Sequence, residues 1–240
     1  INSELLRSYY QEAYVPGNCI LSVVGNVLPD QLMAEVEASF GQLESGTPTA
    51  APAPILNSPS RKFNQVDDSM AYIRAAIPIT TSQDNIAAWA IAAEVLSNAL
   101  QDEIRAKRGK AYRLGAWLNE MKGVSFIEIG VGTRDENLVE IEQVVREIVD
   151  AIPELDPADQ MIQDTANSLV GHELRFRQRR INRAYYPGWR HWQGLGIEFE
   201  TGYIDRLKKV ETESVKELLQ SMLNSDQWFW SVAASEDVSQ

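Results

Sequence analysis

The segment EIRAKRGKAYRLGAW, residues 103–117, gathers the side chains best suited to chemistry. It holds four cations followed by a tyrosine: Arg105, Lys107, Arg108, Lys110 and Tyr112. A guanidinium makes forked hydrogen bonds that orient a bound group, and a phenol is a rigid donor with a long reach. The alternative is a solvated helix end, whose cations stabilise the helix dipole by about 0.3–1 kcal/mol while Tyr112 packs in a sheet.

Metal and nucleophile chemistry find little support in the sequence. The only histidines, His172 and His191, are 19 residues apart. The segment HELRF, residues 172–176, comes near the zinc motif H-E-x-x-H, but Phe176 stands where the second histidine is needed. There is no G-x-S-x-G elbow and no phosphate loop. We therefore expect no metal and no cofactor in this chain, with His172 on a helix surface.

Composition limits the classes of partner. The 240 residues are 44% hydrophobic and 23% charged, which is ordinary for a globular protein. The net charge of −12 disfavours general binding to nucleic acid or anionic membranes. No apolar run approaches the roughly 18 residues that span a bilayer. The single cysteine, Cys19, lies in the apolar run CILSVVG and is expected to be a small core residue.

The basic and aromatic segment RFRQRRINRAYYPGWRHW, residues 175–192, has two interpretations. Arginines interleaved with aromatic rings are typical of single-stranded nucleic-acid binding. The favoured interpretation is a helix pair with its arginines outward and its apolar side chains packed inward, namely Phe176, Ile181, Tyr185 and Trp189.

Hydrophobic periodicity predicts an α+β fold. Expected helices span residues 4–14, 29–40, 84–108, 136–152, 157–178 and 211–223, with more helix after Pro187. Expected strands span residues 19–25, 69–79, 111–118, 124–133 and 228–234, and the third and fourth form a hairpin around the turn NEMKG. A proline-rich linker is expected over residues 46–65.

One internal repeat is visible at a constant offset of 209 residues. It aligns Ile1 with Val210, Glu4 with Glu213 and Arg7 with Lys216, and it aligns Ser22-Val23 with Ser231-Val232. Both copies are expected to be a helix followed by a buried strand. The repeat indicates two copies of one domain of about 200 residues, with only the tail of the first copy present.

Three motifs in this order resemble the pitrilysin/insulinase zinc peptidases, which include the mitochondrial processing peptidases. They are YVPGNCILSVVGN with Tyr14, Pro16, Asn18 and Val23-Val24-Gly25, IRAKRGKAY with Arg105 seven residues before Tyr112, and VETESVKELL. Asn26 stands where the family often has aspartate. The resemblance covers residues 1–235 and implies paired domains with a metallohydrolase-like fold, each a curved antiparallel sheet backed by helices. Residues 1–45 would complete a preceding domain, and residues 66–240 would form the second, non-zinc domain.

The resemblance also implies a function. In family members with an intact pair, the second half lends an arginine and a tyrosine to a zinc site on the first half, where an H-x-x-E-H motif holds the metal. Carried over, Tyr112 would donate to the oxyanion of the scissile carbonyl, and Arg105 would hold a substrate carbonyl. The expected partners are a zinc-bearing half or subunit and a peptide substrate, without nucleic acid and without a membrane span.

By itself the chain is expected not to cleave peptides. The alternatives are a scaffold subunit, like the core proteins of the respiratory cytochrome bc complex, and a peptide-binding module. The expected location is a soluble compartment, with the bacterial periplasm preferred.

Overall fold

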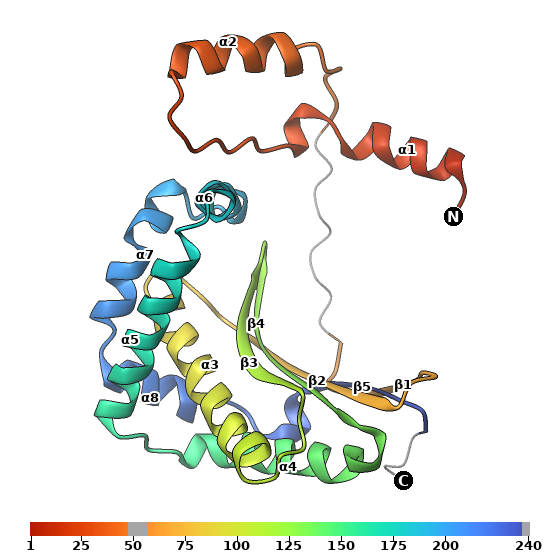
Figure 1. The fold of residues 1–240 in the computed structure, drawn as a ribbon, viewed down its shortest axis with the longest axis vertical. Coiled ribbons are helices and arrows are strands. Elements are labelled where there is room, and N and C mark those ends of the chain that lie inside the picture. Colours follow the sequence, from red (N-terminus) through yellow and green to blue (C-terminus); the bar gives the residue numbers. More distant parts are fainter. Residues whose placement is uncertain (48–56, 237–240) are drawn as a thin grey trace. The chain divides into compact units, whose positions relative to one another are not determined.

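The computed structural model describes residues 1–47 and 57–236 and contains a five-stranded sheet with helices against one face (Figure 1). The strand order is β1-β5-β2-β4-β3. Neighbouring strands are antiparallel, except that β1 is parallel to β5. The bounds are β1 Arg61–Gln65, β2 Met70–Ile79, β3 Arg113–Met121, β4 Val124–Arg134 and β5 Phe229–Ala234. The predicted α+β fold with a helix-backed sheet is confirmed.

The helices follow the expected order, and the bounds of most of them are shifted. The α-helices are α1 Ser3–Ala13, α2 Pro29–Phe40, α3 Ile86–Leu100, α4 Leu138–Ala151, α5 Asp159–Phe176, α6 Arg180–Gln193, α7 Ile197–Lys209 and α8 Thr212–Gln220. Short 3-10 turns are η1 Pro16–Asn18, η3 Asp135–Asn137, η4 Ile152–Glu154 and η5 Ser225–Gln227. The sequence predicted more helix after Pro187, and α6 contains this proline in its interior, with helical residues on both sides of it.

The core lies between the sheet and helices α3, α4 and α8. Strand β2 alternates as predicted, and its core-facing side chains Ala71, Ile73, Ala75 and Ile77 are buried. Helix α3 is apolar around most of its circumference and buries residues from Ile86 to Leu100. Since α3 packs against both β3 and α8, this continuous apolar surface is the form expected of a helix inside the core.

The predicted hairpin is present, but its turn is shorter than expected. Strand β3 continues to Met121 and β4 begins at Val124, so Lys122 and Gly123 alone connect them. Gly123 has a φ of +85°, a left-handed conformation that a glycine adopts without a steric penalty. The NEMKG segment was therefore predicted too long as a turn, because Asn119, Glu120 and Met121 pair with β4.

The described residues fall into two compact units. One comprises residues 1–47 and 174–201, and the other comprises residues 57–173 and 202–236. The boundaries predicted from sequence, 1–45, 46–65 and 66–240, remain a prediction. Residues 48–56 of the predicted linker lie outside the described residues, and its last five residues, Arg61–Gln65, form strand β1.

The predicted strand at residues 19–25 is absent from the described structure. This segment is extended but unpaired, and Cys19 is exposed, so the expectation of a buried thiol was wrong. A strand needs a neighbour to satisfy its backbone groups, and no strand among the described residues pairs with this one. Apolar composition alone could not reveal whether that neighbour is available.

Helix α6 reverses the predicted packing of the basic and aromatic segment. Ile181 and Tyr185 are exposed, at 71% and 52%, whereas Arg190 is only 5% exposed. The Arg190 guanidinium lies 5.1 Å from the ring centroid of Phe199, 3.7 Å from Glu200 through Nε, and donates to Gln193 Oε1 at 3.0 Å. These partners offset the cost of burying a charge, so Arg190 is buried although the arginines of this segment were predicted to face outward.

Candidate functional site

The candidate site begins where helix α3 changes its winding. Residues Gln101–Ala106 form a π-helical turn, η2, in which the backbone amide of Lys107 donates to the carbonyl oxygen of Asp102 at 3.0 Å. Ile104 is fully buried and anchors the turn in the core. The sequence predicted continuous α-helix here. Single π-helical turns are rare and occur frequently at functional sites, and this one carries Arg105.

Gly109 ends the helix and reverses the chain towards β3. Its φ is +65°, as expected of a helix-terminating glycine. Its amide donates to the carbonyl oxygen of Arg105 at 3.0 Å, and the Lys110 amide donates to that of Ile104 at 3.3 Å. These bonds satisfy carbonyl groups at the helix end and bring the chain back past Arg105.

The reversal brings Arg105 and Tyr112 together. Arg105 Nη2 donates to the backbone carbonyl oxygen of Tyr112 at 3.2 Å. The Tyr112 amide in turn donates to the carbonyl oxygen of Gly132 at 2.9 Å, which fixes the backbone at the start of β3. The Tyr112 side chain is 61% exposed. The seven-residue spacing thus places a guanidinium beside the backbone of an accessible phenol.

The phenol borders a polar hollow of about 370 Å³. Its lining is formed by the turn after η2 and the end of β4: Gly109, Lys110, Ala111, Tyr112, Arg134, Glu136 and Asn137. Arg134 is the member that sequence reasoning missed. Its Nε donates to the Tyr112 hydroxyl oxygen at 3.3 Å, and its Nη1 lies 3.7 Å from Glu136 Oε1.

Electrostatics favour a charged Arg134. The pKa of its guanidinium is raised above the ordinary value by the hydrogen bond to Tyr112, by the attraction of the Tyr112 oxygen, and by the charge of Glu136. The predicted hairpin held the signal for this residue. Arg113 of β3 pairs with Gly132 of β4. Since the strands are antiparallel, Arg134, two residues further along β4, lies beside the segment that contains Tyr112.

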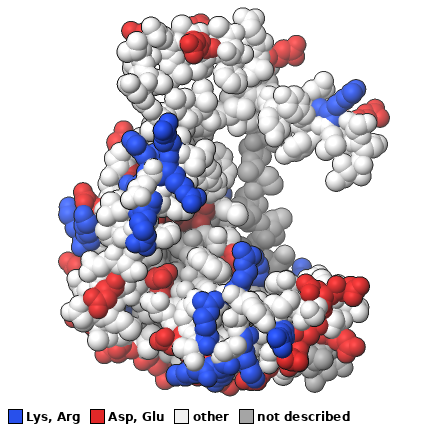
Figure 2. All heavy atoms as spheres, viewed as in Figure 1, with Lys and Arg blue, Asp and Glu red and all other residues white. Residues whose placement is uncertain are grey.

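The other cations of the segment are held by carboxylates. Lys107 Nζ and Arg108 Nη1 lie 2.5 and 2.6 Å from Glu103, whose pKa is lowered by the hydrogen bonds from Lys107 and Arg108. Lys110 pairs with Glu140. Within the described residues, Arg105 makes no ion pair with an acidic side chain. Figure 2 shows basic and acidic side chains interspersed over the lower surface, where α3 and α4 lie in Figure 1.

The sheet face opposite α3 and α4 carries a second hollow, of about 470 Å³, whose lining includes Lys62, Arg74, Glu128 and Phe229. Beside it, the indole of Trp117 lies close over two glycines. A Cβ atom at Gly115 or Gly130 would fall 2.8 or 2.9 Å from this ring. The absence of side chains at these two positions therefore lets the indole approach the sheet closely.

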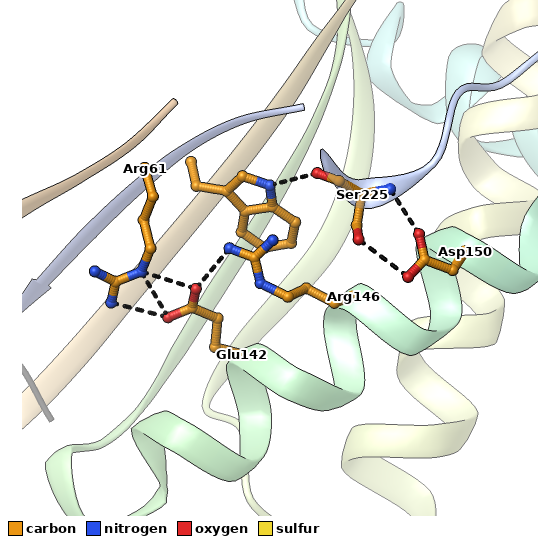
Figure 3. Close-up of polar contacts among 6 residues, drawn as sticks. Arg61, Glu142, Arg146, Asp150 and Ser225 are labelled. Atoms are coloured by element: carbon orange, nitrogen blue, oxygen red, sulfur yellow. Dashed lines mark hydrogen bonds and ion pairs between the residues drawn. The ribbon is translucent and has the colours of Figure 1, made fainter. Parts of the chain in front are cut away.

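The buried carboxylate of Glu142 is structural (Figure 3). Arg61 donates to it from Nε at 2.9 Å and from Nη2 at 3.0 Å, and Arg146 donates at 2.9 Å. The Arg146 guanidinium lies 3.9 Å from the Trp230 ring centroid. With two guanidinium groups on one carboxylate, Glu142 joins β1 to α4 and is unsuited to act as a general acid.

The same helix is tied to η5 at its C-terminal end (Figure 3). Asp150 accepts hydrogen bonds from the amide and the hydroxyl of Ser225 at 2.6 and 3.0 Å, and Ser225 accepts one from the Trp230 indole at 2.9 Å. These contacts hold α4 against β5.

The described residues offer no metal centre. None of their histidine, cysteine and acidic side chains form a group of three or more that could hold a metal ion. His172 is exposed on α5. Burial raises the pKa of Glu94, and the electrostatic interaction with His172 offsets part of this rise. His191 is exposed on α6. Over the described residues, no helix has both the length and the apolar character that a membrane span requires.

Comparison with known proteins identifies the family. Residues 1–169 match the family described as the peptidase M16 inactive domain. The chain belongs to this family. No curated protein sequence matches it. The sequence interpretation as a non-zinc region of a zinc peptidase family is therefore confirmed at the level of the family.

Solved structures share the fold of this M16 inactive domain. One is the peptidase M16 inactive domain from Pseudomonas fluorescens, with a TM-score of 0.83 and 19% identity over 100% of this chain and 59% of that one. The periplasmic protease PqqL from Escherichia coli has a TM-score of 0.66 and 15% identity, over 89% of this chain and 25% of that one. A chain of complex III2 from Candida albicans has a TM-score of 0.76 and 12% identity, over 98% of this chain and 59% of that one. The chain thus spans less than two thirds of the length of these relatives.

Proposed function

We propose that this M16 inactive domain works as the non-zinc region of a zinc-dependent metalloendopeptidase and completes its substrate chamber. In this proposal Arg105 and Tyr112 reach a zinc site on another half or subunit. The observation that carries it is the hydrogen bond from the Arg105 guanidinium to the backbone of Tyr112, whose side chain borders a polar hollow, in a chain of the M16 family. By itself the domain does not cleave peptides.

The chemistry assigned to Tyr112 is stabilisation of negative charge. When a nucleophile attacks a peptide carbonyl, the oxygen gains charge, and a positioned hydroxyl that donates to it lowers the barrier. An exposed phenol on the rim of a hollow can reach such an oxygen on a partner's substrate. The alternative from the sequence is that Tyr112 only packs in a sheet, and an exposed fraction of 61% speaks against this packing.

The chemistry assigned to Arg105 is orientation of the peptide. One donor of its guanidinium holds the Tyr112 carbonyl, which leaves other N–H groups of the fork for a substrate carbonyl. The contact would fix the spacing between the two side chains, because the guanidinium is tethered to the backbone that carries the phenol.

The zinc site belongs to the partner in this proposal. The proposed partner carries the H-x-x-E-H motif and the zinc ion, whose bound water is the nucleophile. The sheet face with Arg74, Glu128 and Trp117 is proposed to line the chamber. Residues 1–45 are proposed to complete a preceding domain, because α1 exposes Leu5, Leu6, Tyr9 and Tyr10. The proposed location is the bacterial periplasm, by likeness to PqqL.

A second candidate is a scaffold subunit. It is favoured by the similarity to a chain of complex III2, with a TM-score of 0.76. A scaffold needs the fold but not an accessible phenol beside an arginine. The two candidates therefore differ in what happens when that phenol is changed.

The test combines the chain with its zinc-bearing half and follows hydrolysis of internally quenched peptides. We expect no hydrolysis by the chain alone and hydrolysis by the combination. Tyr112→Phe should lower kcat by about 10²–10³-fold, the usual effect of removing one oxyanion donor. Tyr185→Phe, which removes an exposed hydroxyl from α6, is the matched control. An unchanged rate in Tyr112→Phe would reject the catalytic role and favour the scaffold.

A further inference from the structure

We propose that Arg134 is a positioning residue for Tyr112: it occupies the acceptor side of the phenol oxygen and thereby directs the phenol proton towards the substrate. The inference rests on the proposed function and deepens it. It concerns a residue at the end of β4, 22 positions beyond Tyr112, that neither the motifs nor the family match single out.

The hydrogen-bond inventory sets the direction of the contact. A phenol oxygen has one proton to donate and lone pairs to accept, whereas a guanidinium has only donors. In the Arg134–Tyr112 pair, at 3.3 Å, the phenol oxygen must therefore be the acceptor. Its own proton then points away from Arg134 and is available for a second partner. Without Arg134 the hydroxyl rotates between solvent contacts.

Charge adds to this orientation. As Tyr112 donates its proton towards an oxyanion, its oxygen gains negative charge, which an adjacent guanidinium stabilises. The guanidinium also has an acidic neighbour, since Arg134 Nη1 lies 3.7 Å from Glu136 Oε1. The raised pKa of Arg134 agrees with a cation that is held in place and does not release its proton.

The fold fixes both members of the pair. Tyr112 is tied to Gly132 through its amide at 2.9 Å. Directly after Arg134, the Asp135 amide donates to the Ser69 carbonyl oxygen at 3.2 Å, and the Asp135 carboxylate accepts from the Ser235 amide at 3.2 Å. The backbone on each side of the contact is thus held by neighbouring strands, so the two side chains meet with little freedom.

A purely structural role is a poor explanation of the pair. The Arg134 side chain is 61% exposed, and exposed polar contacts of this kind contribute little to folding. Replacing Arg134 should therefore leave the fold intact while it changes the hydroxyl of Tyr112. This difference makes the inference testable.

The experiment is a double-mutant cycle in the chain combined with its zinc-bearing half, with internally quenched peptides as substrate. We expect Arg134→Gln to lower kcat by about 10-fold, the lower end of the range for losing one charged hydrogen bond, with little change in KM. In the Tyr112→Phe background the same change should have no further effect, because the hydroxyl is already gone. Arg134→Lys should recover part of the rate. Lys209→Gln, which removes an exposed cation at the end of α7, is the control and should behave as wild type.

A spectroscopic arm uses the chain alone. The ¹³Cζ resonance of labelled Tyr112 should shift in Arg134→Gln and stay unchanged in Lys209→Gln. If Tyr112→Phe is slow but Arg134→Gln keeps the wild-type kcat, or multiplies the Tyr112→Phe defect by its full factor, the positioning role is overturned and the proposed function stands. If Tyr112→Phe itself is unimpaired, the proposed function fails, and the inference fails with it.

Discussion

Arg105 donates from Nη2 to the backbone carbonyl oxygen of Tyr112 at 3.2 Å, so the two candidate residues are joined through the main chain. The tether leaves the phenol hydroxyl free of Arg105 and hydrogen-bonded to Arg134. Under the proposed function, a change at either residue would therefore have a distinct effect: loss of Arg105 would remove a donor to the substrate carbonyl, and loss of the Tyr112 hydroxyl would remove a donor to the oxyanion.

The first prediction concerns Arg105. In the combined enzyme, Arg105→Ala should lower kcat/KM by about 10–100-fold, the factor that corresponds to losing one hydrogen bond from a charged donor. The kcat/KM of Arg105→Lys should lie between those of Arg105→Ala and wild type, because an ammonium keeps the charge but loses the forked hydrogen-bond geometry of a guanidinium. The measurement is hydrolysis of internally quenched peptides at concentrations well below KM.

Lys107→Ala is the matched control for Arg105. Lys107 is exposed, follows Arg105 by two positions and pairs with Glu103 at 2.5 Å. Its loss should leave kcat/KM within about twofold of wild type, since solvent-exposed ion pairs contribute little. Equal effects of Arg105→Ala and Lys107→Ala would contradict a specific role for the guanidinium.

The second prediction concerns the turn that places Tyr112. A Cβ atom at Gly109 would meet nothing within 4 Å, so the cost of Gly109→Ala comes from its φ of +65° alone. We expect the free energy of unfolding to fall by about 1–2 kcal/mol, the cost of the left-handed conformation for a residue with a side chain. Urea denaturation followed by tryptophan fluorescence measures this change.

Gly202→Ala provides the contrasting case. Gly202 lies inside α7 and also has open space around its Cα. There alanine should stabilise by up to about 1 kcal/mol, because glycine is the more costly residue in a helix interior. A loss of stability in both variants would show that side-chain bulk, and not the backbone conformation of Gly109, sets the effect.

Local patterns predicted much of this fold. Helix α2 has the predicted bounds, Pro29–Phe40, because a proline suits the first position of a helix and the apolar period is clear. Strands β2 and β5 follow their alternating or apolar runs closely. The Arg105–Tyr112 adjacency follows from a helix, a terminating glycine and a strand in sequence, which are all short-range features.

Features that depend on distant partners were missed. Strand β1 lies in the predicted linker because its partner β5 is about 170 residues away and its anchor, Glu142, is 81 residues from Arg61. The segment at 19–25 has strand composition, but the described residues supply no neighbour. Arg190 is buried because Phe199 and Glu200 lie beside it, which no pattern within α6 indicates. Arg134 became a candidate only when the hairpin register was known.

The third prediction concerns the pH dependence of stability through Glu142. Burial alone would raise the pKa of this carboxyl, but hydrogen bonds from Arg61 and Arg146 outweigh it and hold the pKa below its ordinary value of 4.5. Between the folded pKa and 4.5 the unfolded chain binds more protons than the folded one, so acidification favours unfolding. The contribution of Glu142 is therefore fully present above pH 4.5 and is lost as the pH falls through the folded pKa.

Glu142→Gln should accordingly destabilise the chain most at neutral pH, by about 3 kcal/mol, because Arg61 and Arg146 lose a buried charged partner. The difference from wild type should shrink below pH 4.5. Urea midpoints and slopes at a series of pH values measure it. Glu94→Gln has the opposite sign: burial raises the pKa of Glu94, so its charged form destabilises the fold above that pKa, and the amide should be the more stable variant at neutral pH. A Glu142→Gln defect that keeps its full size in acid would mean that shape, and not the charge of the carboxylate, holds β1 to α4.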